Sequence, residues 1–221
     1  MARRTKAEAA VTREQLLDAA ERAFRERGVA TTTLGEVAAA AGVTRGAVYW
    51  HFRDKADLIQ ALCERATLPL DAIFQRLRTE ASDDPLGALR KCAIASLTHL
   101  ARDSRAQAVF QLVYQNSGID DDLAPLASAH ERERCGCLNQ VTEIFERAVM
   151  AGQLPADTDP ALAAHALHAY MSGLMQAWVR EPAAYDLAAA APALVDAMLG
   201  GLRASPPRRA APSGVVRDAA D

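Results

Sequence analysis

Apolar residues recur at three- and four-residue intervals along most of the chain, and short polar or Gly/Pro-containing breaks separate these stretches. This spacing places the apolar side chains on one face of a helix, and runs of β-branched residues are scarce, so the pattern predicts an all-α protein of about nine helices. Three short helices are expected before residue 55. Six longer ones are expected at residues 55–79, 86–102, 105–116, 124–151, 160–180 and 187–203.

The first sixty residues carry clear signals for helix starts. Thr12 with Gln15, and Thr33 with Glu36, have the spacing of a capping box, in which a hydroxyl and a later side chain satisfy the free N–H groups of the first turn. Thr44 supplies a further cap directly after the sequence AGV. Two short helices joined by such a turn form a helix-turn-helix, which predicts a DNA-binding unit.

The third short helix has an apolar face and a face of large polar-tipped side chains. Val48 and Phe52 lie four residues apart and are expected in the core, whereas Arg45 and Tyr49 lie together on another face, flanked by Trp50. A donor-rich face with exposed rings is suited to phosphates, base edges and thymine methyl groups in a major groove. The alternative is that Tyr49 and Trp50 merely cover a small core.

Charge and cysteine content narrow the class of protein. The 221 residues carry a net charge of −3, which disfavours nucleic-acid binding by bulk charge, but residues 1–65 hold eleven Lys or Arg against nine Asp or Glu, while the remainder holds fourteen against nineteen. The four cysteines fit no zinc spacing. We expect a cytoplasmic chain without a membrane segment or leader peptide, because no apolar run of the required length is present.

Residues 10–65, through the stretch TREQLLDAAERAFRERGVATTTLGEVAAAAGVTRGAVYWHFRDKADLIQAL, resemble the TetR family of bacterial transcriptional repressors. The resemblance implies a DNA-binding domain at residues 1–54 with a basic arm at 1–11, a helical effector-binding and dimerisation domain at 55–203, and a tail at 204–221 that its Pro-rich composition predicts to be disordered. It also implies that the DNA contacts are made by Thr33, Thr44, Arg45, Gly46, Tyr49, Trp50, His51 and Lys55. Tyr49, His51 and Lys55 would mainly hold phosphates, and Arg45 and Gly46 would lie nearest the bases.

Four short motifs are similar to the branch of this family typified by AcrR and TtgR, which repress multidrug efflux pumps: RRTK near the start, YWHF at 49–52, DPLG at 84–87 and GQLP at 152–155. This resemblance implies a repressor that binds a palindromic operator as a homodimer and leaves the DNA when a small hydrophobic effector binds. The alternative within the same fold is a regulator of other genes that responds to oxidation or to a metabolite.

The predicted helix at 160–180 is apolar or small on nearly every side, so it needs cover on more than one face. The family pairs its last two helices with their copies in a four-helix dimer interface, whereas in a monomer the helices would bury only each other. The residues expected at this interface are Ala166, Ala169, Gly173, Leu194, Val195, Met198 and Leu202.

Polar or deformable side chains interrupt the apolar faces of the middle helices. Adaptable methionines, aromatic rings and a few polar groups suit a cavity for varied apolar ligands, although ordinary core packing explains each residue equally well. The resemblance places the effector pocket among these helices. The residues expected to line it are Cys92, Ser96, Phe110, Tyr114, Val141, His168, Met171 and Met175.

Other kinds of chemistry find little support. His165 and His168 lie three residues apart but lack nearby carboxylates at matching spacing, so we expect no metal and no cofactor. Cys135 and Cys137 lie two apart on a predicted helix, where an internal disulfide would be strained and an intermolecular one is the more favourable redox form. No nucleophile elbow, phosphate loop or carboxylate pair is present, which disfavours the remaining alternative of an all-helical enzyme.

Overall fold

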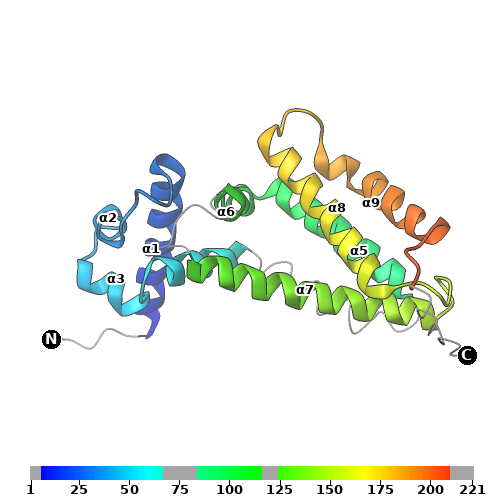
Figure 1. Cartoon of the computed structure of the whole chain (residues 1–221). Helices are drawn as coiled ribbons and strands as arrows, with labels where there is room; N and C mark the ends of the chain where they lie inside the picture. Colours follow the sequence, from blue (N-terminus) through cyan, green and yellow to red (C-terminus); the bar gives the residue numbers. More distant parts are fainter. Residues whose placement is uncertain (1–5, 67–83, 116–123, 210–221) are drawn as a thin grey trace, which may run out of the picture.

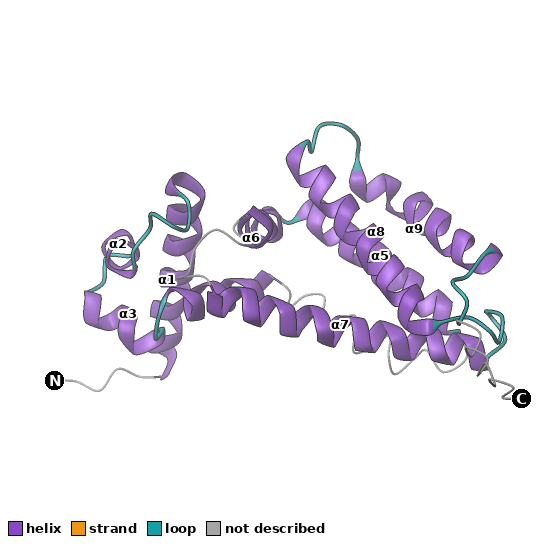
Figure 2. Cartoon of the chain, in the orientation of Figure 1, coloured by secondary structure: helices purple, strands orange, loops and turns teal. Residues whose placement is uncertain are grey.

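The computed structural model describes residues 6–66, 84–115 and 124–209, without the side chains of 6, 112–115 and 124–135. Every regular element within these ranges is helical, so the all-α prediction is confirmed (Figure 2). The elements are α1 (Lys6–Arg27), α2 (Leu34–Ala40), α3 (Arg45–His51), the helical residues 55–66, α5 (Pro85–Arg102), α6 (Ser104–Gln115), α7 (Ala124–Met150), α8 (Pro160–Arg180) and α9 (Leu187–Ala204). The bounds of α5 to α9 agree with the predicted ones to within one residue, and the part of the predicted 55–79 helix beyond residue 66 lies outside the described residues.

The first three helices and residues 55–66 form one small core. Leu16 and Val37 pack with Val48 of α3 and with Phe52, which directly follows α3, as their phase predicts, and all four side chains are buried. Leu58 and its apolar neighbours in the helical residues 55–66 complete this cluster. The domain boundary predicted after residue 54 therefore needs correction, because the following helix is part of the N-terminal core.

The start of α1 differs from the prediction. The helix begins at Lys6, so residues 6–11 are not an extended basic arm. Thr12 lies inside the helix, where its hydroxyl donates to the carbonyl of Glu8 at 3.0 Å instead of capping a first turn. The sequence KAEAA consists of strong helix formers, and a threonine within a helix commonly bonds to the carbonyl four residues earlier.

The other predicted caps of this region are present. Thr33 and Glu36 form a complete capping box at α2, and the Thr44 hydroxyl accepts a hydrogen bond from the Ala47 N–H at the start of α3. Gly28 and Gly42, with φ of +84° and +69°, follow α1 and α2 in the left-handed conformation that glycine adopts most readily. These caps fix the angle at which α3 leaves the turn.

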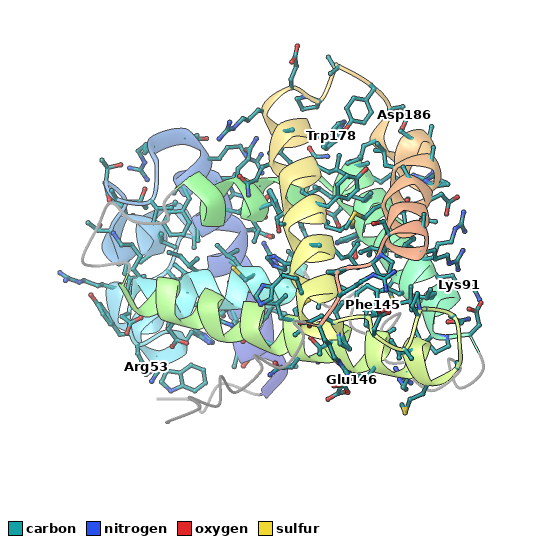
Figure 3. The ribbon with its side chains drawn as sticks, turned by 45° about the vertical axis from the view of Figure 1, so that its right-hand side comes forward. Arg53, Lys91, Phe145, Glu146, Trp178 and Asp186 are labelled. Atoms are coloured by element: carbon teal, nitrogen blue, oxygen red, sulfur yellow. The ribbon has the colours of Figure 1, made fainter. Side chains whose placement is uncertain are left out.

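The C-terminal half is built from α5 to α9. In Figure 1, α7 runs along one side of the molecule, while α8 lies beside α5 and α5 beside α9. Phe145, fully buried, projects from α7 into the shared core, which also holds Leu97, Leu167 and Leu187 (Figure 3). Within this half, α6 lies between α1 and α5 (Figure 1).

Two of the motifs that carry the resemblance meet in space. The Gln153 amide donates to Asp84 Oδ1 at 2.7 Å and accepts from the Leu86 N–H at 3.0 Å, so GQLP binds DPLG at the start of α5. Asp84 also caps α5 by accepting from the Gly87 N–H at 2.9 Å. The Gln153 amide and the Gly87 N–H together hold the pKa of the Asp84 carboxyl below its usual value. These bonds join the start of α5 to the turn after α7.

Replacing Gln153 by alanine is expected to lower the stability of the protein by about 1–2 kcal/mol at pH 7, because the buried Leu86 N–H loses its acceptor and Asp84 loses a donor. The folded-state pKa of Asp84 is depressed, so its stabilising effect is present above about pH 4 and is lost as the pH falls through the folded value. Thermal unfolding should therefore show a larger difference between variant and wild type at pH 7 than at pH 3. Gln140→Ala, at an exposed position of α7, is the matched control. A difference independent of pH would contradict this role for Asp84.

The predicted disordered tail is wrong for residues 204–209. α9 continues to Ala204, and the chain then returns to the turn between α7 and α8. The Asp159 N–H donates to the carbonyl of Pro207 at 2.7 Å, and Arg208 pairs with the Asp157 carboxylate. Pro206 is buried there, so a Pro-rich composition is compatible with fixed structure once the backbone has partners. The remainder of the predicted tail, 210–221, lies outside the described residues.

Candidate nucleic-acid interface

α3 presents the two faces that its sequence predicts. Val48 is fully buried, whereas Tyr49 and Trp50 expose 47% and 73% of their surface. The alternative that these rings cover the core is therefore excluded, since both point outward. A short helix held by caps and a packed apolar face, with large rings on its open side, provides a rigid surface for another molecule.

Arg45 and Tyr49 form a pair on this exposed side. The guanidinium carbon of Arg45 lies 5.8 Å from the centre of the Tyr49 ring, a cation–π arrangement. Arg45 makes no ion pair with the described residues, whereas Arg27 and Arg53 each pair with a carboxylate. Stacking on the ring restricts the Arg45 side chain and leaves its N–H groups available to an outside acceptor.

Next to this pair, Gly46 leaves the surface open. A Cβ atom at this position would meet no other atom within 4 Å, and the backbone is helical, so the fold itself does not require glycine here. Trp50 and His51 follow, with ring centres 4.6 Å apart in an edge-to-face arrangement. Thr44, Arg45 and Gly46 are all exposed. This open strip is where another backbone can approach α3 closely.

Lys55 has a different environment from that of a free surface lysine. Its ammonium donates to the carbonyls of Val29 and Ala30 at 3.1 and 3.4 Å, across the turn that follows α1. The side chain therefore ties the start of residues 55–66 to this turn. A third N–H of the ammonium remains for a phosphate.

The predicted phosphate contact at Thr33 is not favoured by the geometry. The Glu36 carboxylate accepts from the Thr33 N–H at 2.7 Å and from its hydroxyl at 2.9 Å, and it pairs with Arg27 at 3.1 Å. The Thr33 N–H and hydroxyl lower the pKa of Glu36, so this carboxyl is ionised near neutral pH. Because a negative charge already occupies the start of α2, Thr33 acts as a helix cap.

The predicted effector residues lie on α5 to α8, and those with described side chains are all half-buried. Phe110, Val141, Met171 and Met175 pack against the C-terminal core from three different helices. The Ser96 hydroxyl donates to the carbonyl of Cys92 at 3.0 Å within α5. Burial raises the pKa of the Cys92 thiol to about 11, so it is protonated at neutral pH. These positions are neither sealed in the core nor fully exposed.

Three further predictions can be placed only in part. Tyr114 lies in α6, but its side chain lies outside the described residues, and the same holds for Cys135 in α7. Cys137 is a free, exposed thiol on α7. His165 is exposed and His168 half-buried on α8, and within the described ranges no cluster of three metal-binding side chains is present.

The predicted dimer-interface set needs correction. Val195 and Leu202 belong to the protein's own core, with 0% and 6% of their surface exposed, so neither is available to a partner. Leu194 and Met198 are half-buried against the same core. Ala169 and Gly173 are exposed on α8, and Ala166 is half-buried beside them. Val195 and Leu202 thus lie on the inward stripe of α9, which the sequence did not distinguish because this helix is apolar on several sides.

The outer faces of α8 and α9 are unusually apolar for a surface. On α8, Leu162 exposes 52% of its surface. α9 has a mean hydropathy of 1.3 over 18 residues with 28% of them buried, and within the described part it is the one helix long and apolar enough to span a membrane. Its inner stripe packs against α5, so it is a helix of the C-terminal core. Its outer stripe, missed from the sequence, consists of Ala189, Ala193, Ala197, Gly201 and Ala204.

Known protein families match both halves of this arrangement. The N-terminal profile of bacterial regulatory proteins of the tetR family matches residues 16–62, around α3. The profile of the C-terminal region of MAATS-type transcriptional repressors matches residues 84–203, more than half of the chain. The chain belongs to the TetR family.

Individual relatives cover nearly the whole TetR-family chain. The HTH-type transcriptional regulator TtgR of Pseudomonas putida is 39% identical over 209 residues, which cover 95% of this chain and 100% of TtgR. The structure of NalD, the secondary repressor of the MexAB-OprM multidrug efflux pump in Pseudomonas aeruginosa, superposes with a TM-score of 0.79 at 31% identity, covering 89% of this chain and 98% of NalD. SmeT, the repressor of the Stenotrophomonas maltophilia efflux pump SmeDEF, superposes as its triclosan complex with a TM-score of 0.77 at 35% identity, covering 86% of this chain and 91% of SmeT.

This TetR-family protein is a transcriptional repressor with an N-terminal helix-turn-helix, and its relatives are regulators of transcription, not enzymes. The second helix of this helix-turn-helix, α3, carries the ring-stacked Arg45, two exposed rings and the open glycine position.

Proposed function

We propose that this protein is a cytoplasmic, homodimeric repressor that binds a palindromic operator, releases it when a small hydrophobic effector binds among α5 to α8, and controls a multidrug efflux pump operon. The observation that carries the proposal is the exposed strip of α3, opposite a fully packed face. Efflux control is inferred from the 39% sequence identity to TtgR across 95% of the chain and from the structural likeness to NalD and SmeT, which repress efflux pumps.

In this proposal the two base-reading positions are Arg45 and Gly46. Arg45 offers the planar set of N–H donors that pairs with guanine O6 and N7, and Gly46 allows the backbone to come near the base edges. Tyr49, Trp50 and His51 contact the sugar–phosphate backbone and thymine methyl groups, and Lys55 adds a phosphate contact. Thr44 caps the helix toward the DNA.

The proposed dimer uses the outer faces of α8 and α9. Ala169 and Gly173 on α8 and the outer stripe of α9 allow close approach of helices from a second copy. Covering Leu162 and these small residues would remove apolar surface from water. Two-fold symmetry of the protein then requires an approximately palindromic operator.

The proposed effector site lies where half-buried residues of four helices meet the C-terminal core. Cys92, Ser96 and His168 supply a few polar groups, while Phe110 and Met171 supply apolar and adaptable walls. SmeT is similar to this chain over most of its length and was solved with triclosan. We therefore infer that flat hydrophobic compounds, triclosan among them, are the class of effector.

The test is a titration of the promoter region of the protein's own gene. We expect the wild type to bind a labelled promoter duplex and triclosan to release it, with calorimetry showing weaker triclosan binding when the duplex is present, because the two equilibria are linked. Val141→Trp should block triclosan but leave DNA binding intact. Met150→Trp is the matched control, because Met150 lies on the same helix with 78% of its surface exposed.

Two results would reject the proposal. Absence of promoter binding by the wild type would exclude the assigned operator. If triclosan, dyes, antibiotics and plant phenolics all fail to bind or release DNA, and peroxide releases it from wild type but not from a Cys135→Ser, Cys137→Ser double variant, the oxidation-sensing alternative is correct instead.

A further inference from the structure

α6 has side chains in both cores of the molecule. Val109 is buried in the N-terminal cluster, together with Leu16, Phe24 and Leu62, whereas the next residue, Phe110, packs against the C-terminal core. Figure 1 shows α6 between α1 and the pair of helices α5 and α8. Any displacement of α6 relative to α1 must therefore disturb the packing of the DNA-binding unit.

A stripe of three carboxylates on α1 lies at this contact. Glu14, Asp18 and Glu21 are spaced by four and three residues, so they share one face of the helix. Arg65 contacts all three: its Nη1 lies 2.8 Å from Asp18 Oδ1 and 3.3 Å from Glu14 Oε2, and its Nη2 lies 2.9 Å from Glu21 Oε2. The Arg65 and Glu21 side chains are only 14% and 11% exposed, so water screens the contact between them incompletely, whereas Glu14 and Asp18 are 56% and 42% exposed.

The positive charge that balances this stripe comes partly from the other half of the molecule. Arg13 and Arg25 contribute from within α1 itself, at 3.9 and 2.7 Å from the nearest carboxylate oxygens. Arg105, in the first turn of α6, places its Nη2 3.5 Å from Asp18 Oδ1, the same oxygen that Arg65 contacts. Of the described arginines that contact the stripe, only Arg105 belongs to a helix that also packs on the C-terminal core.

A second contact crosses the same boundary one residue after Arg65. The ring Nε2 of His99, on α5, lies 2.9 Å from the carbonyl oxygen of Ala66. α5 and α6 thus both hold the helical residues 55–66, which begin with Lys55 at the turn beside the DNA-reading helix. Buried Val109, the Arg105–Asp18 ion pair and the contact of His99 with the Ala66 carbonyl therefore join the two halves at this boundary.

We propose that Arg105 is the positioning residue through which α6 transmits effector binding to the DNA-binding unit. When α6 holds Arg105 against Asp18, the acidic stripe is neutralised and α1 and residues 55–66 stay aligned. Movement of α6 removes this counter-charge, and Arg65 alone then balances Asp18. The inference rests on the proposed release of operator DNA by an effector, for which it names the coupling contact.

The experiment compares Arg105→Ala, Arg105→Lys and Asp18→Asn with wild type, using the promoter duplex and triclosan as probes. We expect Arg105→Ala and Asp18→Asn to bind triclosan much as wild type does, but to bind the duplex more weakly in its absence, because the contact that keeps α1 and residues 55–66 aligned is lost. The ratio of duplex Kd values with and without saturating triclosan should fall by about five-fold or more, the lower end of ordinary coupling. Arg105→Lys should retain part of the ratio because it keeps the charge. Arg102→Ala, an exposed arginine one turn earlier without an ion pair to the described residues, is the matched control.

Amide hydrogen exchange gives a second readout that needs no effector. Operator binding should slow exchange in α6 of wild type and have a smaller effect in Arg105→Ala, because the two sites act on each other reciprocally. An unchanged Kd ratio together with equal protection of α6 in both proteins would overturn the inference while leaving the proposed function intact.

If wild type instead fails to bind the duplex or to release it with triclosan, the proposed function is contradicted. The inference is then decided by exchange in the DNA-free protein. Faster exchange of α1 and α6 in Arg105→Ala than in Arg102→Ala supports it, and equal exchange rejects it.

Discussion

Replacement of Gly173 by arginine is expected to give a folded monomer that binds operator DNA about 10²–10⁴-fold more weakly than wild type, because a monomer loses the avidity of two linked recognition helices. A Cβ at Gly173 meets nothing within 4 Å in the protein's own fold, so the longer side chain should not disturb the monomer. It would project from the exposed face of α8, between Ala169 and Ala177, where a second copy is proposed to pack.

Sedimentation and fluorescence anisotropy check this prediction. Gly136→Arg is the matched control, since Gly136 is an exposed glycine of α7 whose Cβ would also meet nothing within 4 Å. The control should remain dimeric and bind DNA as wild type does. A dimeric Gly173→Arg protein would move the interface away from the centre of α8.

Phe52→Ala is expected to lower the stability of the DNA-binding unit by about 3–5 kcal/mol, as truncation of a buried phenylalanine typically does. Phe52 exposes 2% of its surface and is among the largest fully enclosed side chains of the protein. It packs with Leu16, Val48 and Leu58, and the Arg13 guanidinium lies 5.4 Å from its ring centre. Its loss would leave a cavity under the end of α3.

Trp50→Ala provides the contrast two residues away. Trp50 is 73% exposed, so the change in stability should stay within about 0.5 kcal/mol, while promoter affinity should fall. Denaturant unfolding followed by circular dichroism, together with anisotropy on the promoter duplex, separates the two effects. Equal stability of both variants would contradict the assignment of Phe52 to a packed position and of Trp50 to an exposed one.

The sequence predicted the DNA-binding unit well because each short helix has one decisive apolar face. Val48 and Phe52 lie four residues apart on one face, while Tyr49 and Trp50 between them lie on another, so only one orientation is possible. Thr33 and Thr44 mark the helix starts where the structure has them. Thr12 misled the prediction because a threonine near favourable helix formers can bond backward to Glu8 as well as cap.

For the C-terminal half, the sequence predicted where the helices begin and end, but not which of their faces pack inward. α9 carries apolar or small residues around most of its circumference, so the periodicity could not tell the stripe of Val195 and Leu202, which packs inward, from that of Ala193 and Ala197. Ion pairs between distant residues, such as Arg65 with Asp18, and the return of Pro206 to the turn after α7 depend on tertiary distances. A single sequence carries no local signal for such distances.

Because the space around Gly46 of α3 is open, a substitution there can affect the proposed recognition of DNA without affecting the packing of the protein. Alanine in place of glycine within a helix typically stabilises it by about 0.5–1 kcal/mol, and nothing in the fold would oppose the added methyl group. The protein thus retains the less stabilising residue at the position where, in the proposed complex, a base pair approaches the helix closely. Under the proposed mode of DNA binding, substitution at this site can therefore change the operator preference with no compensating change in the core beneath α3.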